Sequence, residues 1–501
     1  MTLLNTLARL EAAASGRARP LSRVRHRRLA AQPLVIIPLT LAGDPATPIA
    51  AMTGTSRHGQ QLLAVPQPRS RDLRLGFLAS LAQIVLGYIA SRQNRTEVLP
   101  ATRNREERRR YADAPQVIVP NRAARDYLGL LGRSTRFLPT DGPYAVDPAV
   151  PVLGKWLTFL ADSTDHPAAA LLTDLTSLLA EYWATGQSPL EDASLAAQLA
   201  WIDPPPGMTG LQAALATEDP LRCPPAGPAT DPGFDQAILE PLVRSYDRAA
   251  HAGNQAGVDR AADEISAALR GQLEPTWDAA WHAISLLRAL PETASAGRRW
   301  SADKDSFTRF SSYLADGGLP QPRRDRAATA AARLDRLERA QAAYDVERAL
   351  EDPFVLAELR TGGEAFAGEV VSAEPSRTII TAAGRPVLRP RFTVRTGDPV
   401  RLEPGRVLIC PAHHRQRIQI ADLTRTVTDA DVDVVLEVVQ GMGTPGRPTP
   451  GAVPAAGELV SFTPDPGFFA QRDFPPPDQT PWTHGGPPVR PPASPGEETP
   501  S

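Results

Sequence analysis

The sequence predicts an α+β multidomain protein: a small N-terminal α/β domain, a large all-α middle and a C-terminal small β-barrel, followed by a disordered Pro-rich tail. Three observations lead to this prediction. Short β-branched runs gather near both ends of the chain, apolar residues recur at helical spacing between them, and twelve of the 52 prolines fall in the last 39 residues. The length of 501 residues and the hydrophobic content of 42% allow two to three domains with buried cores.

The composition shifts along the chain give the expected boundaries. These are a basic N-terminal arm at 1–31, a small α/β domain at 32–145, a helical domain at 146–360, a β-barrel domain at 364–462 and the disordered tail at 463–501.

The arm begins with a helical pattern, in which Leu3, Leu4, Leu7 and Leu10 recur, and continues into a basic run. The arginines of this run that we select as candidate nucleic-acid contacts are Arg25, Arg27 and Arg28. Basic runs are commonly solvated and less often bind phosphate, and both interpretations stay open here.

Residues 33–41 of the α/β domain read as a buried strand, and residues 48–52 and 61–65 as its antiparallel neighbours. Asp72 is a plausible N-cap for a helix that runs to about residue 91, and Asn121 can cap a second helix, through residue 131, after a strand at 116–119. The arginine-dense stretch between these helices reads as an exposed loop, and it contributes Arg108, Arg109 and Arg110 as candidate contacts.

The most apolar run of the chain, residues 75–90, is too short to span a bilayer comfortably and is predicted to be a buried helix. The two cysteines, Cys223 and Cys410, cannot form a disulfide scaffold, and the N-terminus lacks the apolar core of a signal peptide. We therefore expect a cytoplasmic protein with no membrane partner.

From residue 150 to 359 the chain reads as nearly all helical. Leucines recur at helical spacing between Leu171 and Tyr182, and a second apolar face includes Trp277 and Trp281. At these spacings we expect the tryptophans to anchor the hydrophobic core rather than to form a cage around a ligand.

Seven short β-branched runs with Pro/Gly turns between them predict the barrel, either OB-like or SH3-like. The runs are 368–371, 377–380, 391–394, 406–409, 417–420, 432–436 and 458–462. Arginines are plentiful here, and Arg391 and Arg417 are selected as candidate contacts, but Phe392 is nearly the sole aromatic residue on the strands. The charge that a nucleic-acid platform needs is present, whereas the aromatic stacking surface is not.

Charge is distributed unevenly along the chain. Residues 1–150 hold 22 arginines against 10 acidic residues, whereas residues 151–300 hold 9 basic against 19 acidic residues. The basic front could bind an anionic partner, or the two regions could neutralise each other within the fold.

Motifs that would identify an enzyme are missing from the sequence. Neither lysine, Lys155 or Lys304, lies in a P-loop, no Gly-x-Gly-x-x-Gly occurs, and no nuclease Glu-x-Lys exists. Cys410, His413 and His414 lack the second ligand pair that a closed zinc site needs. We predict no catalytic residue, no metal ligand and no cofactor.

From these observations we predict a non-catalytic accessory protein. It would contact DNA or RNA through arginines and a partner protein through its helical domain. Two alternatives stay open: a protein–protein adaptor with no nucleic-acid role, and an enzyme of unrecognised type that uses the N-terminal α/β domain. A pocket that unites Asp44, His58 and Asp72 would favour the enzyme.

Overall fold

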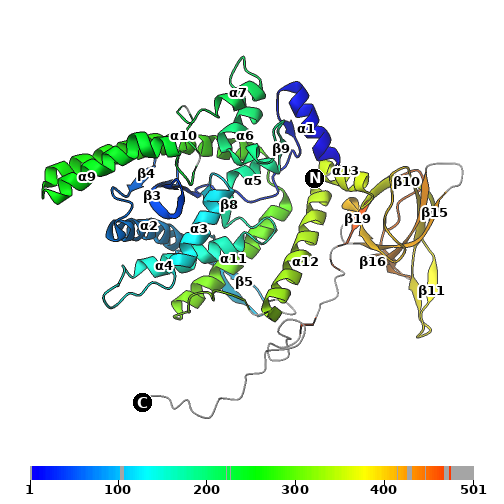
Figure 1. Cartoon of the computed structure of the whole chain (residues 1–501). Helices are drawn as coiled ribbons and strands as arrows, with labels where there is room; N and C mark the ends of the chain where they lie inside the picture. The colour runs from blue at the N-terminus through cyan, green and yellow to red at the C-terminus, as the bar shows by residue number, and fades with distance from the viewer. Residues whose placement is uncertain are drawn as a thin grey trace, which may run out of the picture.

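The computed structural model describes residues 3–101, 106–221, 223–225, 227–325, 327–413, 416–425, 431–445, 447–465, 467 and 473–474. Within these residues the chain is an α+β protein: a mixed sheet with helices comes first, a helical region covers about residues 122–362, and a six-stranded antiparallel barrel follows. The barrel stands to one side of the body, beyond α12 (Ala327–Glu351) and α13 (Pro353–Gly362) (Figure 1). The tail predicted at 463–501 lies almost wholly outside the described residues.

Five strands form the N-terminal sheet in the order β4-β3-β2-β7-β8. Their bounds are β2 (Leu34–Leu41), β3 (Asp44–Gly54), β4 (Gln61–Ala64), β7 (Val117–Val119) and β8 (Leu172–Asp174). β3 pairs antiparallel with both β2 and β4, whereas β7 pairs parallel with β2, and β8 with β7. One strand, β3, thus runs against the other four.

Helices cover both faces of this sheet. Because successive side chains of a strand point to opposite faces, Leu34 and Ile36 enter one core and Val35, Ile37 and Leu39 enter the other. The first core contains residues of α2 (Arg71–Arg92), α3 (Arg122–Thr135), α4 (Ala149–Ser163) and α11 (Ala294–Ala315). The second contains residues of α5 (Leu175–Ala180), α6 (Leu195–Ile202) and α10 (Gln255–Ala289). The body is therefore built in three layers.

α2 confirms the predicted apolar helix and begins slightly earlier than expected. Ser70, rather than Asp72, is its N-cap, and the Ser70 side chain accepts a hydrogen bond from the Leu73 amide. By length and composition α2 could cross a membrane. Its buried residues, which include Phe77, Leu81 and Val85, pack in the core beside the sheet. This packing accounts for the apolar character of the helix.

Two local predictions were wrong. The arginine-dense stretch expected as an exposed loop contains a hairpin of β5 (Thr96–Leu99) and β6 (Arg108–Tyr111). The region 171–182, expected as helix, holds strand β8 before the short helix α5. In both places tertiary contacts determine the local structure, because Arg108 and Arg110 of β6 bind Asp305 of α11 and β8 extends the sheet beside β7.

The helical middle contains a long hairpin that projects from the body (Figure 1). Its helices are α9 (Glu240–His251), which has no buried residue, and α10, whose buried residues include Trp277 and Trp281. The remaining short elements are α1 (Leu3–Ser15), β1 (Arg19–Pro20), β9 (Trp183–Ala184), α7 (Gly210–Ala216), α8 (Pro232–Phe234), β17 (Gly443–Thr444) and β18 (Arg447–Pro448).

The barrel closes with the strand order β10-β13-β16-β15-β14-β19. The bounds are β10 (Phe366–Glu374), β13 (Arg391–Thr396), β14 (Val407–Ile409), β15 (Arg417–Arg425), β16 (Val432–Gln440) and β19 (Leu459–Pro464). The predicted run at 377–380 instead pairs outside the barrel, where β11 (Thr378–Ile380) and β12 (Pro386–Leu388) form a two-stranded hairpin. Phe366, Phe392 and Phe462 pack together inside.

Candidate functional site

Residues 17–31, which we name the strap, lie against the body. The Leu21 amide donates to the Tyr182 carbonyl at 2.8 Å, and the Arg25 amide donates to the Pro291 carbonyl at 2.7 Å. Several strap side chains are buried, including His26 and Leu29. This basic run therefore differs from a solvated arm, since backbone hydrogen bonds and burial hold it in place.

Each selected arginine of the strap binds a carboxylate of the acidic middle region. Arg25 and Arg28 share Glu292, at 3.0 and 3.2 Å, and Arg27 pairs with Glu181 at 2.6 Å. Burial opposes the positive charge of Arg27, but Glu181 outweighs this effect and holds the Arg27 pKa above its usual value. Burial lowers the pKa of Arg25, although Glu292 acts in the opposite direction.

A buried contact between a histidine and an aspartate connects the strap to the start of α13, the helix that precedes the barrel. His26 Nε2 lies 3.3 Å from Asp352 Oδ2, and both side chains are 1% exposed. Asp352 is also the N-cap of α13, where it accepts a hydrogen bond from the Phe354 amide. Burial would raise the Asp352 pKa, but hydrogen bonds from His26, Ser22 and the Phe354 amide hold it below the usual value.

The arginines of β6 divide into paired and unpaired residues. Arg108 contacts Asp305 at 2.7 Å, and Arg110, which is buried, contacts Glu97 at 2.7 Å and Asp305 at 3.0 Å. Arg109 is exposed and has no hydrogen bond or ion pair among the described residues. Of the three, Arg109 is the one whose guanidinium is available to a ligand.

On the barrel, both selected arginines contact carboxylates. Arg391 lies 3.0 Å from Glu437, which also binds Arg377, and Arg417 binds Asp465. Seven of the eight arginines selected from the sequence are therefore paired within the protein. Their role in nucleic-acid binding stays a prediction, and a polyanion would have to compete with these internal carboxylates.

The carboxyl ends of the parallel strands are the usual place for a ligand in an open α/β sheet. Here residues 227–230 of the same chain lie across that edge. The Thr40 amide donates to the Pro228 carbonyl at 2.5 Å, and Asn121 Nδ2 donates to the Gly227 carbonyl at 3.0 Å. Asp174, at the end of β8, pairs with Arg125 at 3.0 Å and caps α5. The edge is thus filled, and its carboxylate is already bound.

Other residues considered from the sequence do not assemble into a site. Asp72 is 91% exposed at the start of α2, and Asp44 accepts a hydrogen bond from Thr47 at the start of β3. Cys410 is buried beside an exposed His413, and His414 lies outside the described residues. Within the described part of the chain, no group of three His, Cys, Asp or Glu residues could hold a metal ion.

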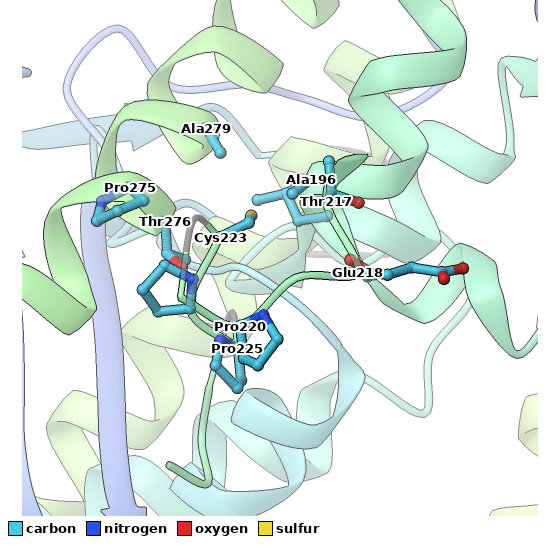
Figure 2. Close-up of a pocket in the computed structure, with 12 residues that line it drawn as sticks. Ala196, Thr217, Glu218, Pro220, Cys223, Pro225, Pro275, Thr276 and Ala279 are labelled. Atoms are coloured by element: carbon cyan, nitrogen blue, oxygen red, sulfur yellow. The ribbon is translucent and has the colours of Figure 1, made fainter. Parts of the chain in front are cut away.

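Cys223 lines a small pocket of about 150 Å³ (Figure 2). Its neighbours there are Pro220, Pro225, Pro275 and Thr276, which offer few polar groups. Burial raises the pKa of the Cys223 thiol. Because the thiolate is the reactive form, this environment does not suit a nucleophilic cysteine.

A larger cleft, about 780 Å³ in volume, lies between the end of α4, residues 166–171, α11 and α12. We name it the central cleft. Its volume falls within the range of about 300–1,000 Å³ that is common for ligand sites. The sequence alone does not reveal it, because its charged residues come from segments as far apart as Asp162 and Glu347 and form no local motif.

Some charges of the central cleft are paired, and others are not. Arg299 binds Glu347, and Arg333 contacts Asp165 at 2.6 Å and Asp325 at 3.5 Å. Four further lining residues form no ion pair with any described residue: Asp162, Asp303, Arg309 and Arg336. Asp303 accepts a hydrogen bond from the Ala170 amide at 2.9 Å.

The titrating groups of this cleft have shifted pKa values. Burial raises the Asp303 pKa to about 7, despite the hydrogen bond from the Ala170 amide and the charges of Arg27 and Arg299. Burial also raises the pKa of Asp162 and lowers that of His166. The Tyr344 pKa rises to about 12 by burial, and its hydroxyl has no hydrogen-bond partner among the described residues. Perturbed groups in a cleft are typical of functional sites.

No family model, curated protein or solved structure matches this chain.

Proposed function

We propose that the protein is a non-catalytic adaptor that binds a partner protein through exposed leucines of α1. The single observation that carries this proposal is the orientation of that helix. Leu3, Leu7 and Leu10 are 60%, 47% and 62% exposed. Their spacing of four and three residues places them on one side of the helix.

The opposite side of α1 is the one that contacts the body. Ala12 is fully buried, and Arg9 contacts Asp192 at 2.9 Å and the Gln187 carbonyl at 2.8 Å. An isolated amphipathic helix gains stability by burying its apolar stripe, yet this one packs through the other side. Exposed apolar surface of this kind marks protein–protein contacts.

The helical region adds two more exposed leucines at a neighbouring position. Leu211 and Leu215 of α7 are 53% and 54% exposed and lie four residues apart, on one face of that helix. The start of α7 meets the end of α1, because the Gly210 amide donates to the Gly16 carbonyl at 2.5 Å. The two helices lie together at one end of the body (Figure 1).

The stripe on α1 also suggests the chemistry of the partner. Anchors spaced as on α1 are the pattern by which an amphipathic helix enters an apolar groove. We expect the partner to supply such a groove, and the non-catalytic part of the proposal is supported by the filled strand-end edge of the sheet.

A photo-crosslinking residue at position 7, introduced into the protein in its source cells, tests the adaptor. We expect one protein to crosslink there, and the crosslink to disappear when Leu10 is also changed to Ser. The control position is Arg260, which is exposed on α10. Equal labelling at positions 7 and 260, or no crosslinked protein, would overturn the proposal.

A second candidate function, contact with nucleic acid, is favoured by three exposed arginines. Arg109, Arg309 and Arg336 lack ion-pair partners among the described residues. Arg309 also lines a shallow cleft with Arg108. Phosphate contacts by such residues would give binding that falls steeply with salt.

The barrel contributes less to this second candidate. The OB- or SH3-like comparison stays a proposal, and the barrel has six strands against the five of an OB-fold. Phe392 is 1% exposed and packs inside the barrel, so it is not available to stack on bases. Nucleic-acid contact would have to come from arginines alone.

Binding of the purified protein to single- and double-stranded DNA and RNA at about 50 and 200 mM salt tests this candidate. Salt-sensitive binding that is lost in the combined variant Arg109→Gln and Arg309→Gln, but kept in Arg260→Gln, would support it. Absence of binding at the lower salt concentration would eliminate it and leave the adaptor.

A further inference from the structure

The central cleft holds unpaired charges of both signs. Asp303 and Arg309 lie on α11, Asp162 lies near the end of α4, and Arg336 lies on α12. None of these four side chains forms an ion pair with another or with any other described residue. A ligand that enters the cleft therefore meets cationic and anionic groups together.

The positions of Asp303 and Arg309 on α11 give an approximate size for the ligand. Asp303 and Arg309 are six residues apart on one helix, which corresponds to about 9 Å along its axis at about 1.5 Å per residue. The two side chains therefore start about 9 Å apart along the helix, which leaves room for a small molecule between their charged groups.

A ligand of one charge would fit this cleft poorly. A simple anion would satisfy Arg309 and Arg336 but would leave the carboxylates near it unpaired, and a simple cation would do the reverse. Groups that a ligand leaves unpaired and desolvated lower its affinity. Matching both signs requires both charges on the ligand.

Between the charges the cleft offers apolar surface. Phe159 and Leu171 line it on one side, and Ala340 and Ala343 of α12 line it on the other. Tyr344 is 6% exposed, and its hydroxyl has no partner among the described residues. Apolar walls with a few polar groups are common in sites for small molecules.

We infer that the central cleft binds a small zwitterion of the amino-acid or dipeptide class. The ligand ammonium group contacts the carboxyl group of Asp303, and the ligand carboxylate contacts Arg309 or Arg336. The apolar walls accept its side chains. This site does not involve the leucines of α1. The experiment below therefore tests the zwitterion site separately from the proposed adaptor function.

Isothermal titration calorimetry of the full chain with three probes tests the inference. The probes are the dipeptide leucyl-phenylalanine, its N-acetylated form, which lacks the ammonium group, and its C-terminal amide, which lacks the carboxylate. We expect the unmodified dipeptide to bind and each blocked form to bind about ten- to hundredfold more weakly, as expected for the loss of one charged contact.

Variants connect the binding to the cleft. Asp303→Asn and Arg309→Gln should each weaken binding of the dipeptide by about tenfold or more. The matched controls Asp263→Asn and Arg260→Gln change exposed residues of α10 and should leave binding unchanged. If Asp303→Asn disturbs folding, Arg336→Gln provides a second test at an exposed residue of the same cleft.

Three results would overturn the inference. One is equal binding of a blocked form and the unmodified dipeptide, which would make one of the charges unnecessary. Another is an equal loss of binding in the α10 controls. The third is no binding of any probe at millimolar concentrations.

Discussion

The arginines of the strap and those of the central cleft are the same residue type in opposite surroundings. Arg25, Arg27 and Arg28 each contact a glutamate at 2.6–3.2 Å. Arg309 and Arg336 have no such contact among the described residues. The three arginines selected from the dense run are thus paired, whereas two isolated arginines on α11 and α12 have no ion-pair partner among the described residues.

The difference shows that the position of acidic partners decides which cations can bind a ligand. The glutamates that hold the strap lie between 154 and 267 residues away in sequence. Local charge density therefore indicates where cations are but does not indicate whether they are free. The predictions below test this comparison, from the largest expected effect to the smallest.

Asp352→Ala should have the largest effect. It removes the partner of buried His26 and the N-cap of α13, and we expect the free energy of unfolding to fall by about 3–5 kcal/mol. Urea denaturation followed by tryptophan fluorescence measures this change. Asp263→Ala, at an exposed position on α10, should change stability by less than about 0.5 kcal/mol. Similar values for the two variants would show that the strap contact contributes little.

The second largest effect should be the pH-dependent contribution of Asp303 to the free energy of unfolding. Burial raises its pKa in the folded protein to about 7, so ionisation is less favourable in the folded than in the unfolded chain. The contribution of this group to stability is therefore lost as pH rises from about 4 to about 7. Asp303→Asn removes the ionisation, and at about pH 8 it should increase the free energy of unfolding by about 4 kcal/mol, because the folded pKa lies about 3 above the unfolded one and each unit is worth about 1.4 kcal/mol.

Below about pH 4 the two proteins should have equal stability, because Asp303 is then protonated in both the folded and the unfolded chain. Thermal or urea unfolding across this pH range checks the crossover. A constant difference at every pH would mean that the substitution acts through packing rather than through ionisation.

Arg27→Gln and Arg309→Gln compare the two regions directly. Loss of the Arg27 contact with Glu181 should reduce the free energy of unfolding by about 1–2 kcal/mol. Arg309 has no pair to lose, so its substitution should change stability by less than about 0.5 kcal/mol. Parallel urea titrations of both variants give the comparison. A larger loss for Arg309→Gln would reverse the assignment of paired and unpaired arginines.

Leu7→Ser should have the smallest effect on folding. Its side chain is 47% exposed, and we expect the free energy of unfolding to change by less than about 0.5 kcal/mol. Denaturation of the purified protein checks this value. A loss above about 1 kcal/mol would mean that the stripe already packs within the chain, and it would remove the basis for the adaptor.

Much of the architecture could be predicted because local patterns carry it. The strand at 34–41 is a continuous apolar run because both of its faces are buried beneath helices. The barrel strands alternate between inward and outward residues, as in β13, where Phe392, Val394 and Thr396 are buried and their neighbours are not. Such periodicity is visible without any tertiary contact.

Other features depended on distant partners and could not be predicted. Strand β8 is three residues long and lies within a leucine-rich run, so its pairing with β7 leaves no local pattern. The hairpin of β5 and β6 is stabilised by Asp305, about 195 residues away. The central cleft is formed by α4, α11 and α12, so its lining residues can be recognised as a group only after these helices have been placed side by side.

The contact of His26 with Asp352 spans 326 residues of chain. At a translation rate of about 5–20 residues per second, roughly 20–60 s pass between the synthesis of these two residues. The N-terminal domain can begin to fold during that interval, but the strap lacks this final anchor. His26 therefore cannot contact Asp352 until translation has passed residue 352 at the start of α13, so the strap is anchored there only in chains that have been synthesised at least that far.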